Sequence, residues 1–177
     1  MANINFNPFP ILTTERLTLR ALSIADQEAI FALRADPAVN KYLDREPSQT
    51  IEDAINFINR INDNIQQNNA IYWVITLRAS QTVVGTICLF DFSAEEKRCE
   101  IGYELLPKFQ GQGYMKEAIT AVIAYVFGTL QFQKIVAFTH KENQHSTQLL
   151  IKSNFSQSAT INEENPDYLI YTLANNN

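Results

Sequence analysis

The chain of 177 residues has few of the residues that mark disulfide-rich, metal-binding or membrane-spanning proteins. Its two cysteines, Cys88 and Cys99, lie in apolar strand-like runs, which favours buried inert thiols over a disulfide framework. Two histidines, His140 and His145, are too few for a convincing metal cluster, so we expect no metal. No apolar run approaches the ~20 residues that span a bilayer, so we expect no membrane partner.

Basic charge is also scarce. Fourteen Lys and Arg face nineteen Asp and Glu, which gives a net charge of −5. Nucleic-acid-binding domains carry a basic patch, so we expect no nucleic-acid partner. An acidic surface suits a cationic amine by steering, or is simply that of a generic soluble protein. The N-terminus lacks the basic region and apolar core of a secretory signal, and we expect a cytoplasmic protein.

The residues that are present predict one α/β domain over residues 1–177. Hydrophobic residues make up 46% of the chain and charged residues 19%, which is normal for a globular protein. Period-two alternation predicts strands, and apolar spacings of three and four predict helices. The expected strands are 17–21, 71–77, 82–90, 98–106, 134–139, 155–161 and 168–173; the expected helices are one from Ser23 to before Pro37, 50–67, 113–130 and 144–152. This order, βααβββαβαββ, predicts a mixed sheet flanked by helices.

The most informative segment is residues 103–118. An apolar run ends at Pro107, a turn with Gly111 and Gly113 follows, and then a helical pattern begins. Glycine lets backbone N–H groups approach an anion, and the start of a helix favours phosphate. We therefore predict that a phosphate-bearing ligand binds at residues 110–116.

Two common glycine motifs do not fit this turn. A Walker A loop needs Ser or Thr after its lysine, but Glu117 follows Lys116. A dinucleotide fingerprint needs a third glycine where Lys116 stands. An ordinary glycine turn into a helix remains the alternative to a ligand site.

The stretch from Gln110 to Met115 resembles the Q/R-x-x-G-x-G/A signature of the GCN5-related N-acetyltransferase (GNAT) family, which binds the pyrophosphate of acetyl-CoA. Gln110 and Gly113 match, whereas Met115 stands where Gly or Ala is usual. Three further stretches are similar to the RimJ/RimL-type branch, in family order and spacing: Thr14–Arg20, Cys99–Leu105 and Asn143–Phe155, the last with Asn154 in place of the usual glycine. The resemblance covers about residues 12–173, which would form the core of a single acetyltransferase domain.

The resemblance implies acetyl-CoA as the cosubstrate. Its pantetheine would lie beside the strand end at 103–106, where a bulge splays that strand from the next and one N–H is positioned for the oxyanion. Asn143 is explained equally well as a helix N-cap or as a pantetheine partner. The expected cofactor-binding residues are Leu105, Leu106, Gln110, Gly111, Gln112, Gly113, Tyr114, Met115, Lys116 and Asn143.

Acetyl transfer to an amine needs a base for the amine and a hydrogen-bond donor for the departing thiolate. Glu100 and Glu104 share one strand face and are the candidate bases; either is also explained as a solvated or ion-paired glutamate. Glu163 and Glu164 are a third option by resemblance. Ser146 falls on the serine of the family's N-x-x-S helix and is the candidate thiolate partner, or a solvated serine.

We therefore predict an acetyl-CoA-dependent N-acetyltransferase whose acceptor is a primary amine, such as a protein N-terminal α-amine. A small-amine or antibiotic acetyltransferase stays open, as does a CoA-binding regulatory module without turnover, which Met115 favours. The sequence leaves a homodimer open. It also does not decide whether Tyr72 and Trp73 face the core or the acceptor cleft.

Overall fold

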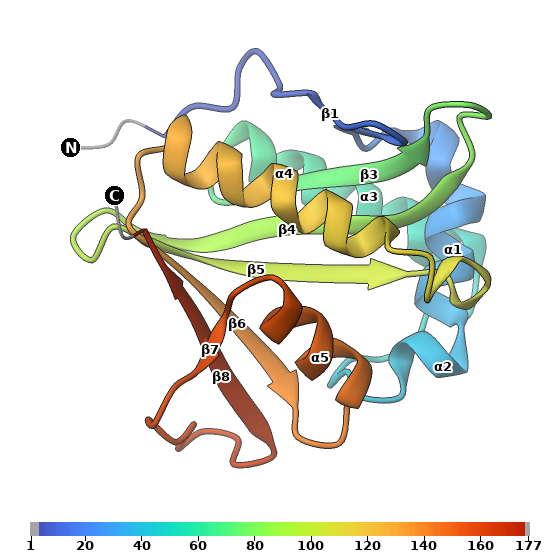
Figure 1. The fold of residues 1–177 in the computed structure, drawn as a ribbon. Helices are drawn as coiled ribbons and strands as arrows, with labels where there is room; N and C mark the ends of the chain where they lie inside the picture. Colours follow the sequence, from blue (N-terminus) through green and yellow to red (C-terminus); the bar gives the residue numbers. More distant parts are fainter. Residues whose placement is uncertain (1–3, 176–177) are drawn as a thin grey trace.

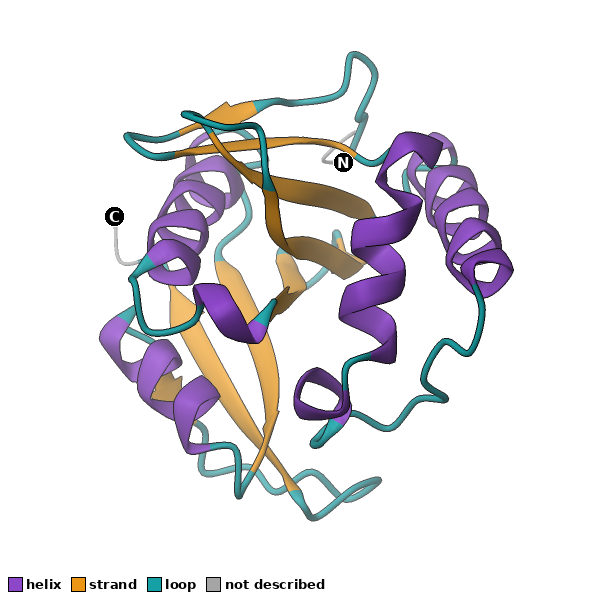
Figure 2. Ribbon diagram, turned by 90° about the vertical axis from the view of Figure 1, so that its right-hand side faces the viewer, coloured by secondary structure: helices purple, strands orange, loops and turns teal. Residues whose placement is uncertain are grey.

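The computed structural model describes residues 4–175 and consists of one mixed sheet with helices on both sides (Figure 1 and Figure 2). The strands are β1 (Leu12–Thr13), β2 (Leu17–Ala21), β3 (Ile71–Leu77), β4 (Val83–Ser93), β5 (Arg98–Leu105), β6 (Lys134–His140), β7 (Ser156–Gln157) and β8 (Tyr168–Ala174). The helices are α1 (Gln27–Ala35), α2 (Pro37–Asn40), α3 (Ile51–Gln66), α4 (Tyr114–Gly128) and α5 (Gln144–Lys152), with 3₁₀ turns η1 (Ile24–Asp26) and η2 (Pro107–Phe109). The predicted mixed α/β sheet is confirmed.

The strand order is β1-β2-β3-β4-β5-β6-β8-β7. Every neighbouring pair is antiparallel except β5 and β6, which run parallel and are joined by the crossover helix α4. Helices α4 and α5 lie on one side of the sheet, in front of it in Figure 1, and α1 and α3 lie behind it. No helix within residues 4–175 is both long and apolar enough to span a membrane.

Apolar side chains fill both faces of the sheet. Trp73 is fully buried on the α4 side, where its ring meets Tyr125 edge-on and its Nε1 donates to the carbonyl of Pro10 at 2.7 Å. Tyr72 points to the other side and packs edge-on against Phe57 of α3. The sequence left these two positions open, and the structure places Trp73 in the core and Tyr72 under α3.

Some predicted helix limits differ from the structure. Pro37 was expected only to end a helix; α1 does end before it, but Pro37 also begins α2. The Asp36 carboxylate caps α2 by accepting from the N–H groups of Ala38 and Val39, and proline suits the first helical position. Helix α4 starts at Tyr114 because Gly113, predicted to be helical, has a left-handed backbone with φ +80° and serves as N-cap.

The closing strand pair is shorter than predicted. Strand β7 contains only Ser156 and Gln157, whereas the sequence predicted a strand over 155–161. Ile161, which suggested the longer strand, is 74% exposed, so no packing surface extends the pairing to it. The structure also adds β1, which the sequence analysis did not predict and which pairs with β2.

Candidate active site

The turn before α4 offers a row of unused backbone donors. Gly111 and Gly113 both have positive φ, +75° and +80°, a conformation that favours glycine. The first intrahelical bond of α4 runs from the Glu117 N–H to the Gly113 carbonyl at 3.1 Å. Within the described residues, no N–H of residues 111–116 donates to a protein acceptor. These N–H groups can donate hydrogen bonds to an anion that has several oxygens, such as the pyrophosphate that the resemblance implies.

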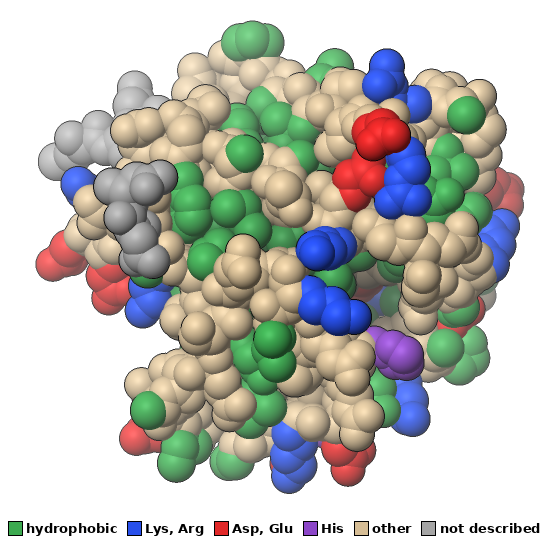
Figure 3. Space-filling view, in the orientation of Figure 1, with side chains coloured by type: hydrophobic (Ala, Val, Ile, Leu, Met, Phe, Trp, Pro, Cys, Tyr) green, Lys and Arg blue, Asp and Glu red, His purple; other side chains and the backbone are tan. Residues whose placement is uncertain are grey.

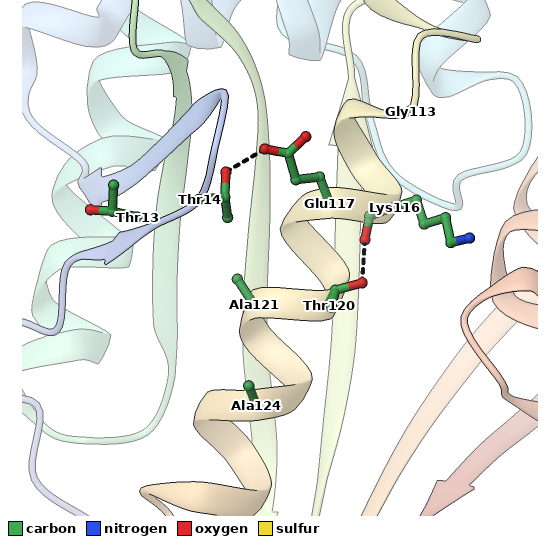
Figure 4. A pocket seen from close by; sticks show the side chains of 8 residues that line it. All are labelled: Thr13, Thr14, Gly113, Lys116, Glu117, Thr120, Ala121 and Ala124. Atoms are coloured by element: carbon green, nitrogen blue, oxygen red, sulfur yellow. Dashed lines mark hydrogen bonds between the residues drawn. The ribbon is translucent and has the colours of Figure 1, made fainter.

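The side chains of this turn have separate surroundings. Met115 is 5% exposed and packs in the core, so its side chain does not enter the turn. Tyr114 packs edge-on against Phe109, and the Arg16 guanidinium lies 4.5 Å from the Tyr114 ring centroid. Lys116 is exposed and points away from Thr13 and Thr14 (Figure 4). Figure 3 shows Lys and Arg side chains next to the start of α4.

The two glutamines and two leucines of the predicted site mostly contact the protein itself. Gln110 donates from Nε2 to the Leu105 carbonyl at 3.0 Å, and Gln112 donates from Nε2 to the Lys108 carbonyl at 3.1 Å. Leu106 donates its N–H to Val84 and its carbonyl accepts from Phe109, so its backbone is already engaged. These contacts fix the shape of the turn.

Arg16 and Glu117 lock the turn to the first strands of the sheet. Arg16 donates from Nε to Glu117 Oε2 at 2.7 Å and from Nη1 to the Gln112 carbonyl at 3.0 Å. Although burial alone would raise it, hydrogen bonds from Thr14 and Arg16 lower the pKa of Glu117. A groove of about 510 Å³ runs from Gly113 along α4 beside Thr14 (Figure 4). In the sequence Arg16 is marked only as part of the family-like stretch Thr14–Arg20, which predicts no role for it.

Strands β5 and β6 separate towards this turn. They pair from Arg98 to Glu100, and no further pairing follows. Because the Leu106 N–H bonds to β4, alternation directs the N–H groups of Tyr103 and Leu105 to the opposite side, towards β6. The expected splay is therefore present, but the register shift lies in β4 between Phe90 and Ser93 and not at the strand end 103–106.

Ser146 forms a hydrogen bond across this gap. Its Oγ lies 2.8 Å from the Tyr103 hydroxyl, which joins α5 to β5. Asn143 Oδ1 accepts from the Ser146 N–H at 3.2 Å, which confirms the N-cap. Burial raises the pKa of Tyr103 to about 12, so the phenol stays protonated at neutral pH. The role of Tyr103 as the partner of Ser146 is not predictable from the sequence, because no local pattern marks a contact between residues 43 apart.

The two candidate bases have different surroundings. Burial, and then the nearby Asp91 carboxylate, raises the pKa of Glu100 to about 7, where a general base works well. Glu100 is the last β5 residue paired with β6. Glu104, about 13 Å further along the strand by strand rise, is ion-paired with Arg45. Glu104 thus has a cationic partner, whereas Glu100 has the perturbed titration expected of a proton acceptor.

The third option for a base lies apart from these groups. Glu163 and Glu164 are exposed in the loop between β7 and β8.

Both cysteines are free thiols, and burial raises the pKa of each to about 12. Within residues 4–175, no group of three His, Cys, Asp or Glu side chains could hold a metal ion.

Comparison with known proteins gives a consistent result. The family profile described as "Acetyltransferase (GNAT) domain" matches residues 16–156. The uncharacterized N-acetyltransferase YoaA of Bacillus subtilis (strain 168) is 34% identical over 155 residues, 88% of this chain and 88% of the relative. The [ribosomal protein uS5]-alanine N-acetyltransferase of Escherichia coli (strain K12) is 27% identical over 158 residues, 82% of this chain and 78% of the relative. The crystal structure of an acetyltransferase (GNAT family) from Bacillus anthracis has a TM-score of 0.81 at 25% identity and covers 93% of this chain and 98% of that chain.

Proposed function

The chain belongs to the GNAT family and is an N-acetyltransferase, and from this premise we propose that it moves the acetyl group of acetyl-CoA to a primary α-amine. The single observation that supports this most strongly is the row of free N–H groups at residues 111–116, which ends beside the gap between β5 and β6. The acetyltransferase domain would extend over about residues 12–173. Met115 no longer favours a module without turnover, because its side chain is in the core.

The proposed chemistry assigns one role to each group. When bound, acetyl-CoA supplies the activated thioester. The free N–H groups of the turn hold its phosphates, and the N–H groups of Tyr103 and Leu105 face its pantetheine arm. Glu100 removes the proton from the attacking amine, directly or through water. The Ser146 hydroxyl, held by Tyr103, donates to the departing sulfur.

A peptide N-terminus is the acceptor that best suits the exposed part of the sheet around β6, on the side opposite α4. Phe138 of β6 is 38% exposed there, and helices α1 and α3 pack over the β2–β3 side. The relative from Escherichia coli is named for acetylating the alanine of a ribosomal protein. This supports an α-amine over an aminoglycoside.

A thiol-release screen tests the proposal. The acceptors are N-terminal peptides, small amines and aminoglycosides, each offered with acetyl-CoA over a range of pH. We expect turnover with at least one peptide α-amine, rising with pH as the amine loses its proton. Tight CoA binding without turnover across the screen would contradict the proposal and favour a regulatory module.

A further inference from the structure

Three arginines gather on the face of the sheet opposite α4. Arg34 lies in the last turn of α1, Arg45 lies between α2 and α3, and Arg60 is on α3. The guanidinium groups of Arg34 and Arg60 lie 3.9 and 5.6 Å from the ring centroid of Phe57. Such a cluster is unexpected in a chain of net charge −5.

The positive charge of this cluster is only partly neutralised. Arg45 donates from Nη1 to Glu104 and from Nε to Asn40 Oδ1 at 2.7 Å. Its Nη2 and the Nε of Arg34 are buried and have no hydrogen-bond partner among the described residues. Within residues 4–175, no carboxylate lies within ion-pair distance of Arg34 or Arg60. Burial, followed by the charge of Arg45, lowers the pKa of Arg34, as expected for a guanidinium beside other cations.

Arg34 and Arg60 border a cavity of about 350 Å³, and Arg45 lies outside its lining. Its lining includes the two arginines that flank Phe57, Arg34 and Arg60. It also includes side chains that can donate hydrogen bonds without carrying a charge: Ser48, Gln49 and Asn56. Two carboxylates also line it, but neither pairs with an arginine. Asp53 Oδ2 instead accepts from the N–H groups of Gln49 and Thr50 at 2.8 and 2.9 Å, and Glu46 is exposed. The cavity therefore keeps two cations, Arg34 and Arg60, that form no ion pair within the described residues.

A chain of polar contacts links Arg34 of the cavity lining to β5. Asn40 donates to the Arg34 carbonyl at 2.9 Å and accepts from Arg45, and Arg45 binds Glu104 on β5. Glu104 stands near the end of β5, beside the gap proposed for acetyl-CoA. The cavity lies on the α1 and α3 side of the sheet, the side on which Glu104 meets Arg45. An acceptor whose amine lies in the gap would extend towards the cavity on that side.

We propose that this cavity binds an anionic group of the acceptor, a carboxylate or a phosphate, while the acceptor's amine meets the thioester; this rests on the proposed transfer function. A planar guanidinium matches the two oxygens of either group. An oxyanion bound between Arg34 and Arg60 supplies the negative charge that no carboxylate within residues 4–175 gives to these two guanidinium groups. The acceptor class is then an acidic or phosphorylated amine and not the cationic amine that net charge alone suggests.

Matched acceptors test this inference. The dipeptide amides Ala-Asp and Ala-phosphoserine present an anion at similar distance from the same α-amine, and Ala-Asn is the neutral counterpart. Acetylation is followed by thiol release in the wild type, Arg34→Gln, Arg60→Gln and Lys152→Gln, the last an exposed charge on α5, across the sheet from the cavity. Acetyl-CoA calorimetry verifies that each variant is folded.

We expect the wild type to prefer at least one anionic peptide over Ala-Asn by ~10-fold or more in kcat/KM. Arg34→Gln and Arg60→Gln should bring that ratio close to one, and Lys152→Gln should leave it unchanged. The two anionic peptides distinguish a carboxylate site from a phosphate site. An equal ratio for anionic and neutral peptides in the wild type would overturn the inference while keeping the transfer function.

A binding measurement separates the two claims. Inorganic phosphate and Ala-phosphoserine are titrated into the CoA-bound protein by calorimetry. Binding that Arg34→Gln abolishes, in a protein that acetylates no amine, would keep the anion site and contradict the transfer function. Binding that persists unchanged in both Arg34→Gln and Arg60→Gln would overturn the site.

Discussion

Replacing Tyr103 with Phe tests whether Ser146 acts at the sulfur. The phenol lies 2.8 Å from Ser146 Oγ, and its pKa of about 12 exceeds the ~8.5 of a thiol by roughly 3.5 units. Full proton transfer from Tyr103 to a thiolate would thus be uphill by about 5 kcal/mol at ~1.36 kcal/mol per unit. In the proposed mechanism Tyr103 therefore orients the serine hydroxyl and is not the acid itself.

The expected magnitudes follow from this geometry. Ser146→Ala removes the donor to the sulfur and should lower kcat by ~10- to 1,000-fold. Tyr103→Phe removes one neutral hydrogen bond, about 1 kcal/mol, and should lower kcat by ~5-fold. If the phenol works only through the serine, Tyr103→Phe changes kcat by less than ~2-fold once Ser146 is alanine.

The assay is thiol release at saturating acetyl-CoA for the four proteins of this double-mutant cycle. The KM for acetyl-CoA should stay close to that of the wild type, because neither hydroxyl is assigned to the phosphates. Thermal unfolding verifies that each variant is folded. Losses that multiply independently, or a wild-type kcat in Ser146→Ala, would refute the reasoning.

Three further sets of predictions concern Gly113 in the turn, the candidate base Glu100, and the Arg16–Glu117 ion pair that holds the turn. Gly113→Val should weaken acetyl-CoA binding by at least ~10-fold, about 1.4 kcal/mol, because φ is +80°, which valine rarely adopts, and the added Cβ would lie 3.4 Å from Arg16 Nη2. Gly128→Val at the other end of α4, where an added Cβ meets nothing within 4 Å, should bind as the wild type does. Equal calorimetric affinities for Gly113→Val and the wild type would contradict this. Glu100→Gln should flatten the acidic limb of the pH–rate profile near pH 7, and an unaltered profile moves the search to Glu104, Glu163 and Glu164. Because the folded-state pKa of Glu100 lies above the ~4.3 of an unfolded glutamate, its ionisation opposes folding, so Glu100→Gln should raise stability above pH 7 by about 1–2 kcal/mol after allowance for solvent screening and not at pH 4, as denaturant titration at both pH values can check. Arg16→Gln should weaken acetyl-CoA binding by ~5-fold, because it removes the side-chain donors to the Gln112 carbonyl and to Glu117 Oε2, while Glu117 Oε1 keeps its bonds from the Thr14 hydroxyl and the backbone N–H of residue 16. Arg78→Gln is the control that should match the wild type, because the Arg78 side chain donates to the carbonyls of Thr14 and Glu15 and not to the turn.

The parts of the fold that local pattern determines were predictable from the sequence. Strand β3 and helix α5 have the predicted limits, because their apolar spacing and flanking residues act within a few positions. The two glycines of the turn adopt positive φ, as their residue type allows. Here the local signal and the tertiary packing agree.

The contacts that complete the candidate site were not predictable in this way. Arg16 and Glu117 are 101 residues apart, and Arg45 and Glu104 are 59 apart. Their pairing depends on how β2, α4 and the loop after α2 meet in space, which no local spacing encodes. The predicted length of strand β7 is wrong for the opposite reason. The local pattern extends to Ile161, but the Ile161 side chain is exposed and has no packing surface there.

The most direct test of the central claim is the response of the backbone amides of residues 111–116 to CoA. Amide chemical shifts and hydrogen exchange are measured by NMR as CoA is added, with the turn at residues 78–81 as an internal reference. We predict that amides 111–116 shift and become protected at the concentration where calorimetry shows binding, while the reference amides do not change. Saturable CoA binding that leaves amides 111–116 unshifted and unprotected would contradict the proposed site.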